Sequence, residues 1–498
     1  MNSASHECTN QASSSSSSIH IRTSPYAGDV DFSTLDRRDR DGGASIDMVS
    51  LADLLRNSFV YPPHTIYSDV KILTTGFAVQ PGTQDELRFQ FPYQSASATA
   101  RPPSHAVSDD ALLRSYHRLL TQSVQRCTTH VKAPWFLQSG GKDSTSVAIA
   151  VADVRPDTTC LTYLGGKEEN EVESARFVAR RVGLRHEALV CDPRRAYDRY
   201  LAMIPRMPLL TADFAMLSYA DLATEIGHHH GDGIIDAMGV DLFFGVPMHL
   251  RDYLIIGLAR QMAIPAAWLT YPFVRQNFKL CFALASLQMN PFERYIPGSR
   301  FSDREVDALF GWSASVQSRQ RMDVFQDAVR AAPSAEGVRR IVLAMLEAGG
   351  FAKSLYCANS LGLRMAYPYC DKPFCEWLFN DVPDDRLVGR HGLNKVLQRR
   401  YIARHFQQLP YVQHKGSFRF DVPGLARQCF EQVHAFALQA RAILPGAAAW
   451  LEGHRHCLGN KFFASKFYLL AVTLPWLLSR TSRTTAVAND DEALRVTS

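Results

Sequence analysis

The stretch Ser139-Gly140-Gly141-Lys142-Asp143-Ser144 decides the fold that we expect for this chain. It follows a short apolar run, 134–138, and opens a stretch whose apolar residues have helical spacing, 144–154. Adjacent glycines allow a tight turn in which backbone N–H groups close on an oxyanion, and a helix N-terminus adds partial positive charge. The stretch therefore predicts a phosphate-binding loop between a β-strand and an α-helix.

The polar side chains of this loop suit the same ligand. We expect Ser139 and Ser144 to donate hydrogen bonds to phosphate oxygens, and Asp143 to hold a magnesium ion that bridges those oxygens. The spacing differs from the GxxxxGK[ST] of a Walker A loop. The plain alternative is a Gly-Gly turn with capping Asp and Ser residues, but the strand before it and the helix after it favour phosphate binding.

Strand and helix patterns alternate around this loop, and single helices between strands imply parallel pairing. We therefore predict an α/β fold with a doubly wound parallel sheet, followed from about residue 250 by a largely helical part. The expected strands are 134–138, 159–164, 187–190 and 233–237, and the expected helices include 109–126, 144–154, 170–182, 219–226, 305–310, 319–330 and 334–347.

The two ends of the chain differ in composition from the middle. Residues 1–45 contain a serine tract and few large apolar residues, so we expect them to be disordered. They lack the apolar core of a signal peptide. Residues 46–104 predict a small β-rich unit and a linker, with strands near 70–73 and 87–91. The main domain is expected at 105–480, and a second disordered tail at 481–498.

Composition narrows the function classes for the 498 residues. A formal net charge of +5 gives no support to a nucleic-acid binder. No run of about 18 apolar residues is present, so we expect no membrane span. The ten cysteines include no CxxC pair, which indicates reduced thiols and a cytoplasmic location. We interpret His228-His229-His230 as an exposed turn, and His454, His456 and Cys457 as a weak candidate for zinc.

Several sequence motifs of this chain resemble those of one protein family. The loop is similar to the SGGxDS loop of N-type ATP pyrophosphatases, and the chain from about 113 to 479 resembles the synthetase domain of asparagine synthetase and β-lactam synthetase. The further matches, in family order, are Glu171, Ala175, Ala179, Gly183 and His186 (E-x-x-x-A…G-x-x-H), 239–245 (G-A-D-E-L-F-G), 363–371 with Pro368 and Asp371, Lys395, Leu397 and Arg399 (K-x-L-x-R), and 415–423 (K-x-G-F-x-x-P).

The resemblance implies a sheet of the adenine nucleotide α-hydrolase type and an ATP-dependent reaction. A substrate carboxylate would attack the α-phosphorus of ATP and release pyrophosphate, and an amine would then displace AMP to form an amide. Lys415 corresponds to the family's catalytic lysine, which offsets developing charge; the alternative is a solvated surface lysine. Ser139, Gly140, Gly141, Lys142, Asp143, Ser144 and Gly239 would bind ATP and pyrophosphate, and Asp143 and Asp241 would hold Mg²⁺.

The residues support the metal assignment independently. Asp143 and Asp241 follow different predicted strands, and ligands bind at the carboxyl edge of open α/β sheets. The alternative for Asp241 is a turn residue beside Gly239.

Departures from the family pattern indicate which kind of enzyme this is. Asn2 stands where glutamine-dependent members have a cysteine nucleophile, and only 46–93 resembles the end of their glutaminase domain, so we expect no ammonia supply from glutamine. Met238, Leu242 and Arg364 replace family acids, and Leu355-Tyr356 replaces a common Asp-Arg pair. The ATP elements remain while groups on the acceptor side have changed, which predicts a new acceptor.

These departures favour a lasso-peptide macrolactam synthetase, which joins an Asp or Glu side chain of a precursor peptide to the peptide's own N-terminal amine. A precursor peptide and its processing protease are the expected partners. Two alternatives stay open: a ligase that uses ammonia or a small amine on a small carboxylic acid, and a non-catalytic nucleotide-binding partner protein. A tRNA-modifying ATP pyrophosphatase is a further alternative, but the sequence has no Cys pair and no strongly basic appendage to support it.

Overall fold

The computed structural model describes residues 19–22, 45–73, 107–165, 169–244, 271–289, 300–331, 335–389, 393–408 and 420–496. Two short strands, 77–79 and 87–89, and the single residues 32, 35, 268, 293 and 410 complete this set. The structural statements that follow concern these residues.

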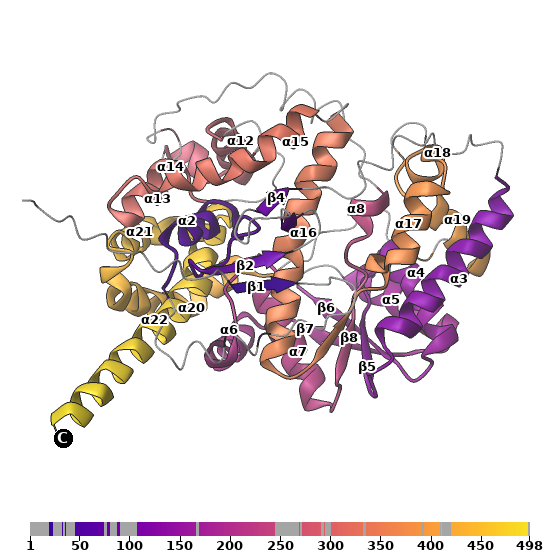
Figure 1. Ribbon diagram of the computed structural model, residues 1–498, viewed down its shortest axis with the longest axis horizontal. Helices are drawn as coiled ribbons and strands as arrows, with labels where there is room; N and C mark the ends of the chain where they lie inside the picture. The colour runs from indigo at the N-terminus through magenta and orange to yellow at the C-terminus, as the bar shows by residue number, and fades with distance from the viewer. Residues whose placement is uncertain are drawn as a thin grey trace, which may run out of the picture.

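A five-stranded parallel sheet lies among helices in the lower right-hand part of Figure 1. Its order is β7-β6-β5-β8-β9, with strands β5 (Pro134–Leu137), β6 (Thr159–Leu164), β7 (Arg185–Val190), β8 (Gly233–Ile235) and β9 (Arg364–Ala366). The chain adds strands on one side of β5 and then returns to add β8 on the other side. The carboxyl ends of β5 and β8 therefore meet at a topological switch point, which is where open α/β sheets bind ligands.

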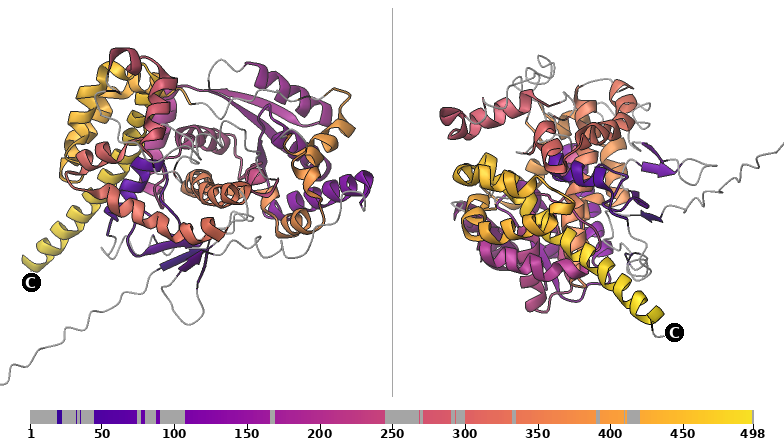
Figure 2. Two further views of the ribbon diagram at one scale, coloured as in Figure 1. Left: turned by 90° about the horizontal axis from the view of Figure 1, so that it is seen from above. Right: turned by 90° about the vertical axis from the view of Figure 1, so that its left-hand side faces the viewer.

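Helices cover both faces of this sheet, which confirms the predicted α/β class (Figure 2). One group contains α3 (Asp109–Cys127), α4 (Lys142–Val154), α5 (Glu169–Val182) and α19 (Val396–His405), in which α4 contacts the other three. The other group contains α6 (Pro193–Met203), α7 (Met216–His228) and α16 (Ala335–Ser360). Parallel strands need cover on both faces because their crossover helices lie there.

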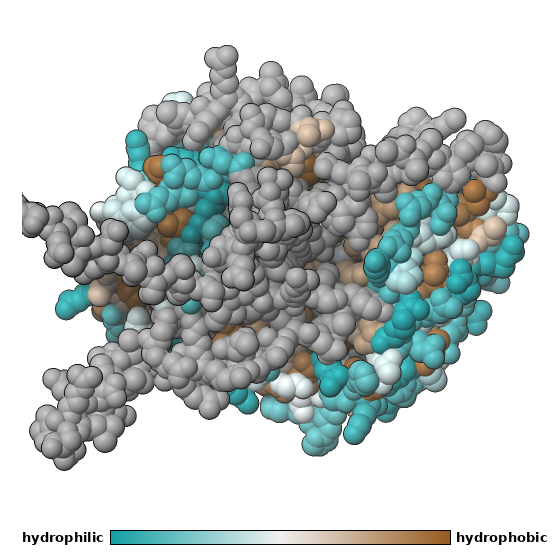
Figure 3. All heavy atoms as spheres, in the orientation of Figure 1, coloured by the Kyte–Doolittle hydropathy of each residue, from teal (hydrophilic) through white to brown (hydrophobic). Residues whose placement is uncertain are grey.

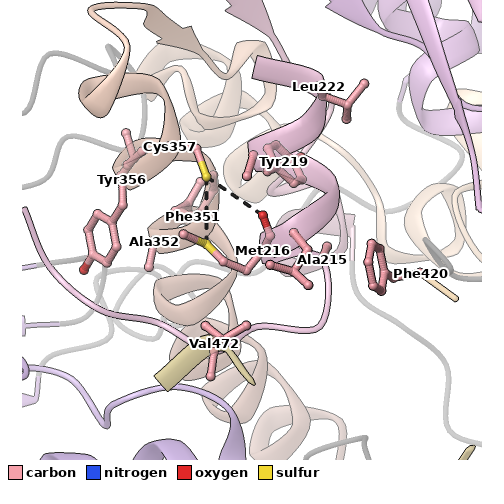
Figure 4. Close-up of a cluster of buried hydrophobic side chains, with 14 of the residues drawn as sticks. Ala215, Met216, Tyr219, Leu222, Phe351, Ala352, Tyr356, Cys357, Phe420 and Val472 are labelled. Carbon is pink, nitrogen blue, oxygen red and sulfur yellow. Dashed lines mark hydrogen bonds between the residues drawn. The ribbon is translucent and has the colours of Figure 1, made fainter. Parts of the chain in front are cut away.

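The core is continuous from the sheet into the helical part of the chain. In the region shown in Figure 4, Met216 of α7 packs against Cys357 of α16, with the Cys357 Sγ 3.9 Å from the Met216 Sδ. The surface in the described part of Figure 3 is largely hydrophilic over the sheet-covering helices, with apolar residues scattered among polar ones. Scattered exposed apolar residues are normal in a soluble fold.

The segment after residue 45 contains a helix that the β-rich prediction missed. Helix α2 (Met48–Asn57) begins at Asp47, whose carboxylate accepts hydrogen bonds from the N–H groups of Val49 and Ser50. Its buried Arg56 pairs with Glu293 at 2.5 Å and with Asp303 at 2.9 Å, which ties α2 to the helical part of the chain. Periodicity over ten residues separates helix from strand poorly. The predicted strand at 70–73 is confirmed as β2 (Val70–Leu73), which pairs with β1 (Ile19–Arg22), while β3 (Phe77–Val79) pairs with β4 (Leu87–Phe89).

Three further elements differ from expectation. The predicted helix 319–330 is broken into α14 (Ala314–Gln320), a 3₁₀ turn (Arg321–Phe325) and α15 (Gln326–Ala331), and β9 was not predicted. Helix α22 runs Lys461–Val496 and so enters the tail for which we expected disorder. Extending an existing helix costs far less than nucleating a new one, and the part before residue 481 is firmly buried.

The first part of α22 is long and apolar enough to cross a membrane by length and composition. Yet 89% of its most apolar window is buried inside the protein, as in the core helix of a soluble domain. Helices α20 (Val422–Gln439), α21 (Ala447–His454) and α13 (Asp303–Phe310) lie around it (Figure 1).

A buried ion pair fixes α13 against α22 and gives a first prediction. The Lys466 Nζ lies 2.7 Å from both carboxylate oxygens of Glu305, which also accepts hydrogen bonds from Ser302. Burial disfavours the charged Glu305, but Lys466 and Ser302 outweigh it and lower its pKa. We expect Glu305→Gln to reduce the free energy of unfolding in urea at neutral pH by about 3 kcal/mol, because it leaves a buried ammonium unpaired.

The effect has a defined pH dependence. Because the folded pKa of Glu305 is lowered, its stabilisation is present above the ordinary pKa of about 4.3 and is lost as pH falls through the folded value. The matched control is Glu376→Gln, whose exposed partner Lys372 lies 3.7 Å away, and it should change stability by less than about 0.5 kcal/mol. Equal losses in the two variants would contradict the argument.

Candidate active site

The loop after β5 has the geometry of an anion site. Gly141 is the N-cap of α4, and no side chain caps the first N–H groups of this helix. The Ser144 hydroxyl donates to the Ser139 carbonyl at 2.7 Å, and the Gly141 N–H donates to the Ser139 Oγ at 3.3 Å. Ser144 therefore holds the loop together, and its direct contact with phosphate stays a prediction. The Ser139 hydroxyl keeps its proton for a ligand or for the Ser144 Oγ, 3.0 Å away.

Gly140 allows the loop to pack directly on α5. A Cβ at this position would lie 2.8 Å from the Cα of Glu171, and a backbone atom cannot move aside. Glu171 was predicted only as a motif match, and this contact explains why it lies beside the loop. His186 of the same motif lies on β7, with its Nε2 2.8 Å from the Thr162 hydroxyl. Burial lowers the pKa of His186 to about 4, and nearby Arg176 adds to this, so the imidazole is neutral at pH 7.

Lys395 joins the two strand-end carboxylates. Its Nζ lies 2.9 Å from the Asp143 Oδ1 and 2.5 Å from the Asp241 Oδ1. The Lys395 side chain is 2% exposed, whereas the Asp143 and Asp241 side chains are 21% and 45% exposed. Despite burial, the two carboxylates raise the pKa of Lys395 above its ordinary value. The ammonium therefore stays charged and holds both acids at one place.

The position of the Lys395 side chain between the two carboxylates strains its backbone. Lys395 is the N-cap of α19 and has φ +57° and ψ +45°, the left-handed conformation that non-glycine residues rarely adopt. Such strain is found where the surrounding structure demands a particular side-chain position. Here the Lys395 side chain has to place its ammonium between the carboxylates of Asp143 and Asp241.

The site carries more positive than negative charge among the groups that act on Lys142. The charged groups that act on the Lys142 ammonium are the cations Lys395 and Arg399 and the anions Asp143 and Asp241. Burial, and then these cations, lower the pKa of the Lys142 ammonium below its ordinary value, although the two carboxylates oppose the shift. Three cations facing two carboxylates suit a polyanion such as a triphosphate.

A buried hydrogen-bond network contacts the loop at the backbone carbonyl of Asp143. The Tyr369 hydroxyl donates to the Asp143 carbonyl at 3.2 Å and accepts from the Gln398 Nε2 at 2.7 Å. The hydroxyls of Tyr116 and Ser146 lie 3.2 and 2.8 Å from that of Tyr369. Sequence reasoning missed Lys395 and Tyr369 as site residues, although the first lies in the matched K-x-L-x-R motif and the second between Pro368 and Asp371.

Gly239 shapes the loop after β8. It has φ +90°, and a Cβ there would lie 2.6 Å from the Cys370 Sγ. This close approach lets Asp241, in the first turn of α8 (Val240–Phe244), reach the same ammonium as Asp143. The structure therefore brings together Asp143, Asp241 and Lys142, three of the predicted site residues. The buried Asp371 forms an ion pair with the half-exposed Arg126, which is a structural role.

Further polar groups gather beyond the carboxyl end of β8. Asp236, 7% exposed, accepts a hydrogen bond from the Tyr219 hydroxyl. Lys353 lies 5.5 Å from the centre of the Tyr219 ring, and its Nζ is 3.4 Å from the Asp213 carboxylate. Met238 is half-buried beside Tyr219, with its Sδ 3.8 Å from the Tyr219 hydroxyl.

The other two replaced acids lie elsewhere. Leu242 is 2% exposed and belongs to the core, and Arg364 is exposed at the amino end of β9, opposite to the edge that carries the loop. The expectation that both changes alter the acceptor site is therefore wrong for Arg364, because a one-dimensional match does not show at which end of a strand a residue lies. Lys415 lies outside the described residues. His228 to His230 are exposed at the end of α7, as predicted.

The donor set can accept magnesium together with a nucleotide. No three His, Cys, Asp or Glu side chains come together as a metal cluster in the described part of the chain. Mg²⁺, however, is commonly held by one or two carboxylates plus substrate phosphates. Asp143 and Asp241 share one ammonium and are both partly exposed, so they fit that role.

The sheet order, the glycine loop and the strand-end carboxylates define an α/β protein of the ATP-pyrophosphatase type. The family model for asparagine synthase matches residues 115–432, and the chain therefore belongs to the asparagine synthase family, a family of ATP-dependent amide ligases. This confirms the central part of the predicted resemblance.

One similar solved structure is that of NMN synthetase from Francisella tularensis, which is 15% identical and covers 49% of this chain and 96% of its own, with a TM-score of 0.23. That likeness is too weak to carry an argument. No curated protein matches the chain.

The Lys395 bridge gives a second prediction. We expect Lys395→Met to lower the free energy of unfolding by about 2 kcal/mol, because the two partly hydrated carboxylates lose the buried cation that bridges them and keep only the more distant charges of Lys142 and Arg399. Lys372→Met, at a position 82% exposed, should change it by less than about 0.5 kcal/mol. Urea unfolding measures both. An unchanged stability in Lys395→Met would show that the bridge does not hold the site together.

Proposed function

We propose that the protein activates a substrate carboxylate as an acyl-adenylate and passes it to an amine, and that the substrate is a ribosomal peptide closed into a macrolactam of the lasso type. The observation that supports it most is the set of charges around Lys395. The proposed triphosphate groups Lys142, Asp143, Asp241 and Lys395 lie together, which supports nucleotide binding, whereas Met238 stands on the proposed acceptor side where the family has an acid. We further propose a cytoplasmic location, and a processing protease as partner.

On this proposal the loop receives the triphosphate. The uncapped N–H groups at the start of α4, beside Gly141, and the Ser139 hydroxyl donate to phosphate oxygens. Lys142 and Lys395 offset the charge that grows on pyrophosphate as it leaves. Asp143 and Asp241 would hold Mg²⁺, which neutralises phosphate charge when bound. Lys415 remains the proposed catalytic lysine on the strength of its motif.

The acceptor side would hold the attacking amine. An amine reacts only after losing its ammonium proton, and acids beside it can orient the ammonium and accept that proton. Asp236 is positioned for this at the end of β8, where Tyr219 fixes its carboxylate by a hydrogen bond. The thioether of Met238 is uncharged and adaptable, and it suits an apolar peptide better than a small charged amino acid.

The decisive test is chemical. Candidate precursor peptides are incubated with the full chain, ATP and Mg²⁺, and mass spectrometry follows the peptide while AMP and pyrophosphate are measured. A peptide that loses one water, with AMP and pyrophosphate formed in equal amounts, supports the proposal. ATP consumption that is independent of peptide contradicts it. Pyrophosphate exchange that depends on aspartate would instead favour the small-molecule ligase.

A matched pair of variants tests the role of the site. We expect Asp143→Asn to lower pyrophosphate release by at least about 100-fold, because it removes a carboxylate that would hold Mg²⁺ and one partner of Lys395. Asp153→Asn changes an exposed residue of the same helix, and it should leave the rate within about twofold. Full biological function in Asp143→Asn would favour the non-catalytic nucleotide-binding partner.

A further inference from the structure

Large aromatic side chains are exposed close together on one segment. Trp268, Tyr271, Phe273 and Phe278 are 57%, 65%, 70% and 37% exposed. We call these four residues the aromatic cluster. Tyr271 is the N-cap of α11 (Pro272–Arg275), Phe273 lies within α11, and Phe278 is the first residue of α12 (Phe278–Leu287). Both helices lie toward the outside of the helical part, in rose in Figure 2. Grouped exposed aromatic residues mark a contact surface more often than single ones do.

Helix α12 adds an apolar face to this cluster. Its sequence, FKLCFALASL, is apolar on every side except at Lys279 and Ser286, yet only Cys281 and Ala285 are buried. Helix α12 packs against α22, and just before α22 the Asn460 Nδ2 donates to the carbonyl of Arg275 in α11 at 2.7 Å. A helix that is apolar all round is normally enclosed by a core or by a membrane. Among the described residues, Leu280, Phe282, Leu284 and Leu287 are only half-buried, and Phe278 and Ala283 are exposed.

The charges of the same segment have one sign. Residues 271–289 contain Arg275 and Lys279 and no Asp or Glu, and in the sequence the acid-free run extends from 253 to 292. Aromatic residues interleaved with Lys and Arg, without acids, are typical of segments at the headgroup level of a bilayer. Each cation near an anionic surface adds to the attraction. The segment is therefore complementary to an anionic lipid surface.

The length of α12 decides the mode of contact. Its ten residues span about 15 Å, half of the roughly 30 Å hydrocarbon core of a bilayer. The helix is too short to cross and is anchored to the protein by Cys281 and Ala285. It can only lie in the interface plane, with the aromatic cluster inserted among the headgroups.

We propose that the aromatic cluster and α12 form a peripheral membrane-binding surface that docks the protein on anionic lipid. This inference is independent of the acceptor substrate. The buried first part of α22 remains within the core and takes no part in the contact.

Vesicle sedimentation of the full chain tests the proposal. We expect binding to vesicles of phosphatidylcholine with phosphatidylglycerol, and weaker binding to phosphatidylcholine alone. The double variant Trp268→Ser with Phe273→Ser should lower the partition coefficient by about tenfold or more, because two large apolar side chains no longer leave water. Lys279→Gln should lower it about fivefold on the anionic vesicles only.

Controls separate this result from misfolding and from self-association. Leu438 is 51% exposed on α20, so Leu438→Ser should bind as the unaltered chain does. All variants should keep the same urea unfolding midpoint, because the changed side chains are exposed. Failure to sediment with anionic vesicles, equal binding of the double variant, or a lipid-free dimer that the double variant abolishes would each overturn the proposal.

Discussion

The candidate site depends on the two ion pairs that the buried ammonium of Lys395 forms with the carboxylates of Asp143 and Asp241. Two carboxylates from loops after different strands would repel each other at this edge, and a charge enclosed by protein needs a partner to remain ionised. Lys395 meets both requirements at once, since it lies 2.9 Å from Asp143 and 2.5 Å from Asp241. It thereby connects α19, far along the chain, to the turns after β5 and β8. Its left-handed backbone is the cost of this connection.

The two sides of the site are built differently. On the nucleotide side, the loop is fixed by hydrogen bonds of Ser144 and Tyr369 and by the contact of Gly140 with α5. After β8, a half-buried thioether lies beside a Tyr–Asp pair. On the proposed function, the rigid loop would bind the common nucleotide and the groups around Met238 would meet the second substrate.

Several long elements could be predicted from the sequence, because their apolar periods are unambiguous and their ends carry strong signals. The strand β6 has the predicted bounds. Short or mixed elements were missed for a physical reason. The three residues of β9 gain strand structure only by pairing with β8, and α2 is held by ion pairs from Arg56 to acids 237 and 247 positions away. The break at Arg321, which binds Asp53 and Asp47, also depends on partners distant in sequence.

The sequence by itself determined the class of sheet, the strand–turn–helix around Gly140 and Gly141, and the family motifs, because each is encoded in a few adjacent residues whose backbone chemistry is local. Only the tertiary structure decided which motif residues share a site. It placed Lys395 between Asp143 and Asp241, moved Arg364 to the opposite edge of the sheet and left Phe278, the first residue of α12, exposed. Burial and charge pairing arise between elements, so the order of residues along the chain does not contain them.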